Sequence, residues 1–213
     1  EFVAHTRALI LDLRGNGGGG SEVGPVLESM FLPKQVKLLE FRSRGGQVTT
    51  VETVSWIQQK RYTNPLFILI NKKTGSAAEA LTFALQAKKR ATVVGQPSAG
   101  AANMNSWYVV NSEIYVSVST GAPTLPGTET SWERKGIQPD HKVAEGNEIE
   151  DVLRMIGQPN PIAEPQVWGG AFEEYGYTSP MRERGVIKFR ITTILLAELS
   201  SVAERHSMKS TQM

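Results

Sequence analysis

Two short segments of the sequence contain groups suited to binding and attacking a carbonyl group. The first is the run of glycines at residues 17–20, which follows the apolar run ALILDL at 8–13. Glycines after a strand let backbone N–H groups approach an anion closely. The second is TGSAAE at 74–79, where Ser76 stands between a loop and a predicted helix. The amide of the next residue, Ala77, would then point at negative charge that develops beside the hydroxyl.

The glycine segment is compatible with two kinds of anion site. The spacing G-x-G-x-x-G at 15–20 fits a dinucleotide-binding loop, with Glu40 as the ribose-binding acid. Four consecutive glycines satisfy that spacing almost freely, so this nucleotide interpretation is the weaker one. Alternatively, an amide of Gly18 or Gly19 joins that of Ala77 in an oxyanion hole, as in acyl transfer.

Ser76 also has an ordinary structural interpretation. With Glu79 it forms the S-x-x-E pattern of a capping box, which stabilises a helix start by about 1 kcal/mol and needs no catalysis. A capping serine can still act as a nucleophile. The pattern by itself therefore leaves both roles open.

The elements around these segments indicate an α/β fold. Apolar runs at 8–13, 65–70 and 91–95 are typical of strands buried on both faces of a parallel sheet. Right-handed crossovers between such strands bring their C-terminal ends, and so both segments, to one edge of the sheet. Further predictions are helices over 21–32, 76–89 and 147–157, a hairpin over 36–54, and antiparallel strands over 106–110 and 113–120.

The predicted organisation is a core over residues 1–157 followed by a linker and helical extension over 158–213. Prolines mark the linker, and the stretch 186–206 has the pattern of an amphipathic helix, which suits docking or homo-oligomerisation. The chain enters its first strand within about seven residues, so we expect a segment upstream of it.

Composition excludes several classes of function. The net charge of the 213 residues is only +2, which does not indicate a nucleic-acid-binding surface. No apolar run reaches the length of a transmembrane helix. There is no cysteine and there are three histidines without metal-ligand spacing, so neither a metal nor a cofactor is expected.

Three segments in this order resemble the tail-specific, or C-terminal-processing, serine peptidase family. They are ALILDLRGNGGG, PLFILINKKTGSAAEALTFALQAKKRATVVGQPSAG and SWERKGIQPD, and the resemblance covers roughly residues 8–145. It implies a crotonase/ClpP-like α/β core, with a mainly parallel sheet flanked by helices and added antiparallel strands. It also implies hydrolysis of a peptide or protein substrate through an acyl-enzyme on Ser76, whose oxyanion is held by Ala77 and the glycine turn at 17–19.

The departures from the family pattern concern the general base. The processing peptidases use a lysine where this chain has Ala101, and an acid where it has Ala87. The chain is more similar to the branch of the tricorn core, the nisin-resistance peptidases and the retinoid-binding modules. In that branch the resemblance implies a histidine from an upstream segment and a supporting glutamate at Glu133.

Neither His5 nor His141 suits the role of base from its place in the sequence. A second interpretation is therefore an inactive relative that binds a retinoid, a fatty acid or a peptide. Because most relatives act outside the cytoplasm, the resemblance favours a periplasmic or secreted location.

Overall fold

The computed structural model describes residues 3, 6–20, 22–58, 60–157 and 190–192. The elements in order are β1 (Leu9–Asp12), α1 (Val23–Ser29), β2 (Lys37–Ser43), β3 (Val48–Glu52), β4 (Leu66–Ile70), α2 (Ala77–Ala87), β5 (Thr92–Gly95), β6 (Met104–Val109), β7 (Tyr115–Thr124), β8 (His141–Lys142), α3 (Glu148–Met155) and β9 (Arg190–Thr192). The predicted α/β class is confirmed, and each predicted strand and helix up to residue 157 is present.

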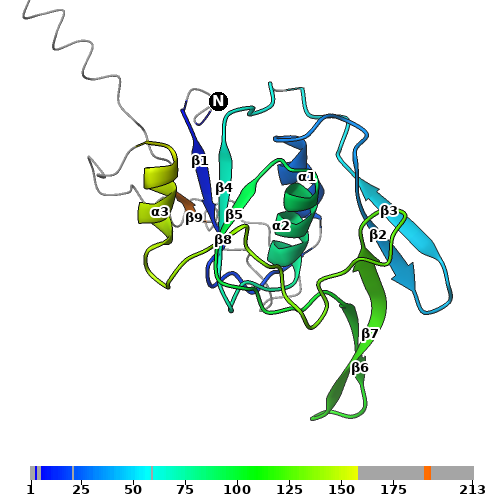
Figure 1. Cartoon of the computed structure of the whole chain (residues 1–213). Coiled ribbons are helices and arrows are strands. Elements are labelled where there is room, and N and C mark those ends of the chain that lie inside the picture. Colours follow the sequence, from blue (N-terminus) through cyan, green and yellow to red (C-terminus); the bar gives the residue numbers. More distant parts are fainter. Residues whose placement is uncertain (1–2, 4–5, 21, 59, 158–189, 193–213) are drawn as a thin grey trace, which may run out of the picture.

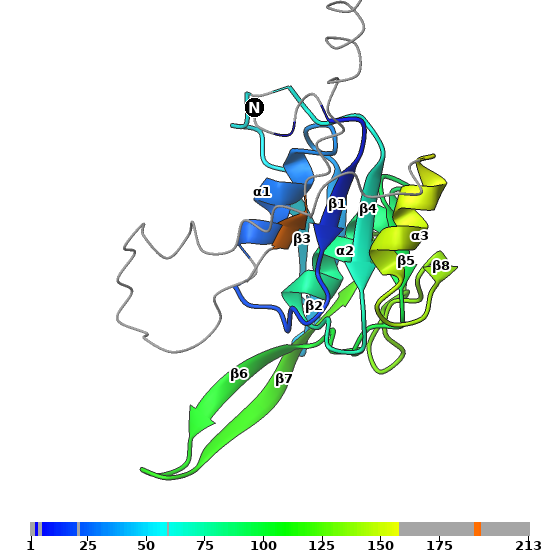
Figure 2. The same ribbon diagram turned by 90° about the vertical axis from the view of Figure 1, so that its left-hand side faces the viewer.

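The strands form two sheets. The first has the order β8-β5-β4-β1-β9, with β1, β4, β5 and β8 parallel and β9 antiparallel to β1. The second is antiparallel, with the order β3-β2-β7-β6. Helices α1 and α2 lie between the two sheets, while α3 covers the other face of the first sheet (Figures 1 and 2).

The near-continuous apolar runs are explained by this layering. In β1, Leu9 and Leu11 belong to the buried cluster that contains Leu81 and Leu85 of α2. Ile10, between them, belongs to a second cluster with Val152 of α3 and other residues. Successive side chains on a strand point to opposite faces, so the middle of a strand between two helical layers is apolar on both faces.

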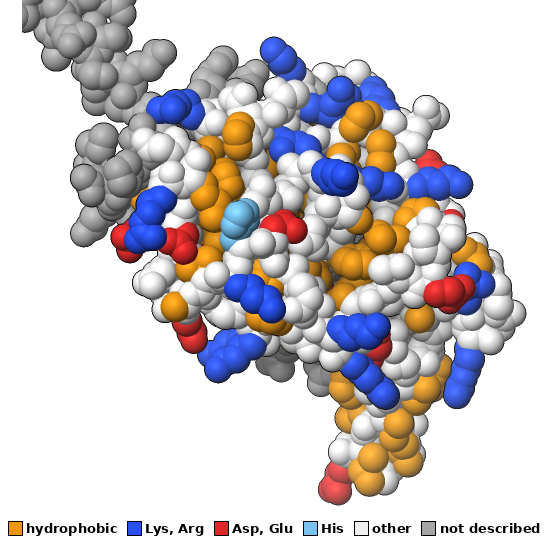
Figure 3. Space-filling model, viewed as in Figure 1, with side chains coloured by type: hydrophobic (Ala, Val, Ile, Leu, Met, Phe, Trp, Pro, Cys, Tyr) orange, Lys and Arg blue, Asp and Glu red, His pale blue; other side chains and the backbone are white. Residues whose placement is uncertain are grey.

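The hairpin β6–β7 projects away from the rest of the chain (Figure 1). Apolar side chains cover it, as the lower right of Figure 3 shows. The exposed large apolar residues on β6, β7 and the turn between them are Met104, Trp107, Tyr108, Val109, Val110, Ile114, Tyr115 and Val116. In the described part of the chain, no helix combines the length and apolar character that a membrane span requires.

Two sequence-based expectations need correction. The helix predicted over 186–206 is wrong at Arg190–Thr192, which form β9; the rest of that stretch lies outside the described residues. Here β9 covers the edge of β1, and an edge strand's unpaired backbone groups favour such pairing. Glu40, the acid of the nucleotide interpretation, does not end a strand of the parallel sheet as that interpretation requires. It lies within β2 of the antiparallel sheet and accepts a hydrogen bond from the Gly127 amide.

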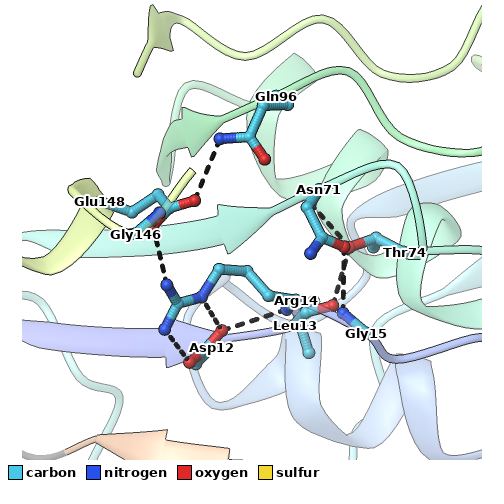
Figure 4. A network of polar contacts seen from close by, with 9 residues as sticks. All are labelled: Asp12, Leu13, Arg14, Gly15, Asn71, Thr74, Gln96, Gly146 and Glu148. Atoms are coloured by element: carbon cyan, nitrogen blue, oxygen red, sulfur yellow. Dashed lines mark hydrogen bonds and ion pairs between the residues drawn. The ribbon is translucent and has the colours of Figure 1, made fainter. Parts of the chain in front are cut away.

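A polar network ties the end of β1 to α3 (Figure 4). The Arg14 guanidinium donates to both Asp12 carboxylate oxygens at 2.8 and 2.7 Å, and to Glu148 at 2.8 Å. Glu148 also accepts from Gln96 at 3.0 Å and from the Gly146 amide at 2.9 Å. Burial raises the pKa of Glu148, but these hydrogen bonds and the Arg14 charge outweigh it and leave the pKa below its usual value.

We expect Glu148→Ala to lower the free energy of unfolding by about 1–3 kcal/mol, because Gln96, Gly146 and Arg14 each lose a buried acceptor. The matched control is Glu150→Ala on the same helix, whose pair with Arg154 is more than half exposed and should change stability by no more than about 0.5 kcal/mol. Urea unfolding of both variants measures the difference. Equal effects would contradict a structural role for the network.

Candidate active site

The glycine turn and the start of α2 meet in space. The Gly75 amide donates to the Asn16 carbonyl oxygen at 2.9 Å, which joins the two loops directly. A Cβ atom added at Gly18 would lie 2.6 Å from the Ser76 Cβ and 2.9 Å from the Ala77 nitrogen. Gly18 also has a φ of +97°, a backbone conformation that residues with a Cβ atom rarely adopt. This close approach therefore requires glycine at position 18.

Two side chains on the β4–α2 loop fix the approach of the turns. Thr74 donates its hydroxyl proton to the Leu13 carbonyl at 2.7 Å, at the end of β1. Asn71 accepts hydrogen bonds from the amides of Gly15 at 3.1 Å and Lys73 at 3.0 Å, as Figure 4 shows in part. The loop after β4 is thus bound to the loop after β1 through both side chains and backbone.

Ser76 stands at a strained turn with its side chain open to solvent. Its φ of 52° and ψ of −122° are values that residues with a Cβ rarely adopt, and such conformations cost about 1–3 kcal/mol. The residue is exposed and immediately precedes α2. The predicted capping box with Glu79 is present. Ser76 is therefore both a helix cap and an accessible hydroxyl.

Glu79 connects this turn to the loop after β5. It is fully buried, and its carboxylate accepts from the Ser76 amide at 2.9 Å and from the Ala101 amide at 2.9 Å. It also accepts from the Ser98 hydroxyl at 2.5 Å and the Gly100 amide at 2.7 Å. The capping pattern revealed the first of these bonds. The others join segments about twenty residues apart, and no sequence pattern marked them.

The backbone amides at the turn differ in their availability. Ala77 is the first residue of α2, where amides have no intrahelical acceptor, and no other acceptor for it is found among the described residues. The Gly18 amide donates to the Asn16 side chain at 2.9 Å. For the Gly19 amide the described residues contain no acceptor. Of the two predicted glycine donors, Gly19 is thus the one open to a ligand in this conformation.

Glu133 lies in the loop before β8, close to the site in the fold. One of its carboxylate oxygens accepts from the amides of Ala102 and Asn103 at 2.9 and 3.0 Å. Both of those residues line the same cleft as Ser76. No hydrogen bond between Glu133 and Ser76 occurs in the described part of the chain. Its predicted supporting role stays a prediction.

The described residues bring no basic side chain to Ser76. His141 lies on β8, two strands away from β4, and is exposed. Lys72 and Lys73 are exposed, and Ala101 stands beside Glu79 without a lysine side chain. His5 and His206 lie outside the described residues. Within those residues, no group of three or more His, Asp or Glu side chains is arranged to hold a metal ion.

A cleft of about 830 Å³ opens beside Ser76, between α1, α2 and the antiparallel sheet. Its apolar walls include Leu38, Leu39, Leu81 and Trp132, which are all buried. Glu28, on α1, also lines it.

Glu28 is only 3% exposed, and no ion pair or hydrogen bond to its carboxyl group occurs among the described residues. Burial raises the pKa of Glu28 to about 8. The sequence did not mark Glu28, because a charged residue next to the apolar positions of a helix is normally expected on its exposed side.

Comparison with known proteins identifies relatives. The sequence model of the family described as peptidase family S41 matches residues 2–143 of this chain. A carboxyl-terminal-processing peptidase from Arabidopsis thaliana is 31% identical over 137 residues, covering 64% of this chain and 26% of its own length. A carboxyl-terminal-processing protease from Synechocystis is 30% identical over 134 residues, covering 63% of this chain and 30% of its own length.

A solved structure shares the fold. The structure of a putative peptidase from Parabacteroides merdae superposes with a TM-score of 0.59 at 22% identity, over 74% of this chain and 54% of that one. The matched part of this chain spans under a third of the length of the Arabidopsis and Synechocystis relatives. The family resemblance drawn from the three sequence motifs is confirmed.

We expect Gly18→Ala to displace the turn at Ser76, because the added methyl group would overlap Ser76 and Ala77. The free energy of unfolding should fall by about 1–3 kcal/mol, and the amide resonances of Ser76 and Ala77 should shift. The control is Gly17→Ala, where an added Cβ meets nothing within 4 Å. It should leave these resonances in place and change stability by no more than about 1 kcal/mol. Matching spectra for the two variants would contradict the close contact.

Proposed function

The chain belongs to peptidase family S41, and we propose that it contributes the nucleophile and the oxyanion-binding amides of a serine peptidase. Ser76 is the proposed nucleophile, and the amides of Ala77 and Gly19 are the proposed oxyanion donors. The observation that carries the proposal is the contact between the Gly18 backbone and the Ser76 turn. Because this contact joins two separate loops beside an exposed hydroxyl, it supports a site in which amides of both loops bind one oxygen.

The proposed reaction is hydrolysis of a peptide bond in two steps. The Ser76 oxygen attacks the carbonyl carbon, and its proton passes to a base and then to the leaving amine. The carbonyl oxygen becomes negative, and amides already oriented toward it stabilise that charge without reorganisation. Water then attacks the acyl-enzyme and releases the acid product and the serine hydroxyl. Peptides or proteins are the proposed substrates.

The proposed base is a histidine supplied from outside this segment of the protein, as the family resemblance implies. A serine hydroxyl is a weak nucleophile without a neighbouring base. The loss of that base typically reduces the rate by several powers of ten. The position of Ala101 supports this assignment, because its short side chain provides no amine at the turn held by Glu79. A lysine base at this position is therefore not part of the proposal.

The proposal predicts that a fluorophosphonate probe labels the natural full-length protein at Ser76 and that Ser76→Ala abolishes labelling. Gly18→Ala should slow labelling by about 10²- to 10³-fold, since a displaced turn removes an oxyanion donor. Gly17→Ala serves as the control and should label at the parental rate. Rates are followed by intact-protein mass spectrometry, with the labelled residue located by peptide mapping.

Two results would overturn this assignment. One is labelling at a different residue. The other is an unlabelled, folded protein that retains binding of a fatty acid or retinoid, which would indicate an inactive member that uses the apolar cleft as a ligand site.

A further inference from the structure

The cleft beside Ser76 contains a buried carboxyl group that has no partner in the described part of the chain. Glu28 and Glu79 are both buried, at 3% and 0% exposure. Glu79 accepts four hydrogen bonds and holds two loops together. No donor and no cation meets the Glu28 carboxyl in the described part of the chain. Burying such a group without partners costs free energy, so the fold alone gives no reason for an acid here.

The surroundings of Glu28 define what could partner it. The described residues that line the cleft include no Lys, Arg, His or Asp, and the other ionisable one is Glu22, which is exposed. The walls nearby are apolar, from Leu38 and Leu39 on β2 to Leu81 on α2. A ligand group that suits this site has an apolar stem and a positively charged, hydrogen-bond-donating end.

We propose that the cleft is a subsite for a basic peptide side chain, Lys or Arg, whose aliphatic stem lies on Leu38 and Leu81 and whose charged end pairs with Glu28. This rests on the proposed function, since Ser76 and Ala77 line the same cleft. The substrate class is then a peptide with a basic residue next to the attacked carbonyl. Long basic side chains combine an apolar stem with a cationic head in this way.

The pKa of Glu28 gives the proposal a specific pH dependence. Burial raises this pKa to about 8, so the empty cleft holds a neutral carboxyl at pH 6 and a carboxylate at pH 9. A basic side chain favours the carboxylate, so its binding releases a proton at pH 6 and does not at pH 9. The preference for a basic side chain over a neutral one should therefore grow as the pH rises through about 8.

The test measures peptide binding to the natural full-length chain carrying Ser76→Ala, so that no hydrolysis occurs. Trp132 and Trp107 line the cleft and report binding by their fluorescence. Two peptide pairs are compared, one with Lys against norleucine and one with Arg against citrulline. At pH 9 the basic peptide should bind at least about 10-fold more tightly, and at pH 6 the ratio should fall below about 3-fold.

Glu28→Gln is the decisive variant, and Glu22→Gln is its control at the exposed acid of the same cleft. Glu28→Gln should remove the preference at both pH values, while Glu22→Gln should keep it. A preference that persists in Glu28→Gln, or equal binding of both peptides at pH 9, overturns the proposal. Failure here with normal labelling of Ser76 would overturn the subsite and leave the peptidase proposal intact. The reverse result would support binding of a basic side chain at Glu28 and overturn its assignment to a peptidase substrate.

A stability measurement tests whether Glu28→Gln remains folded and whether the Glu28 carboxyl is buried in the parent protein. An unfolded chain releases this proton near pH 4.5, whereas the folded chain holds it up to about pH 8. The parent therefore loses stability as the pH rises through that window. Glu28→Gln removes this loss, so its melting temperature should exceed that of the parent more at pH 8 than at pH 5. A constant difference across this range would overturn the assignment of Glu28 as the buried acid of the cleft.

Discussion

The contact between two backbone turns, one at Gly18 and one at Ser76, is the constraint on which the site depends. Only a residue without a Cβ fits at position 18, and Ser76 itself occupies a strained conformation. Strain of this kind persists only where surrounding interactions over-determine the backbone. Here Asn16 holds Gly75 from the side of the glycine turn, and Glu79 holds the Ser76 amide from the side of α2. The parallel pairing of β1 with β4 places both loops at one edge of the sheet.

Two buried carboxyl groups beside this contact illustrate different uses of the same chemistry. The carboxylate of Glu79 is surrounded by donors, so it can remain in the interior and fix the loop after β5 against the serine turn. Glu28 has no such donor among the described residues and lies where the cleft meets α1. A satisfied buried acid stabilises the geometry of a site, while an unsatisfied one at a cleft is available to a ligand. Burial alone does not distinguish the two roles, whereas counting their hydrogen bonds does.

Most of the fold followed from local patterns, because those patterns have direct physical causes. The apolar run at 8–13 had to lie between two helical layers, and TGSAAE carried the cap that begins α2. The meeting of the glycine turn with Ser76 was inferred from strand order, and the contact at Gly18 bears it out. What the sequence could not reveal depends on distant segments. The additional partners of Glu79 come from the loop after β5. Glu28 becomes a cleft residue only through the packing of α1 with α2 and the antiparallel sheet around the cleft. The strand at Arg190–Thr192 was missed because its pairing partner, β1, lies far away in the chain.

The proposed site requires amides from two loops to converge on one oxygen beside Ser76. A crystal structure of the protein after reaction with a fluorophosphonate tests it most directly, because the phosphonyl oxygen stands in for the oxyanion of a tetrahedral intermediate. The phosphorus should be bonded to the Ser76 oxygen, and the phosphonyl oxygen should lie about 3 Å from the amide nitrogens of both Ala77 and Gly19. A phosphonyl oxygen that contacts neither amide, or that contacts the α2 start alone with the glycine turn directed elsewhere, would contradict it.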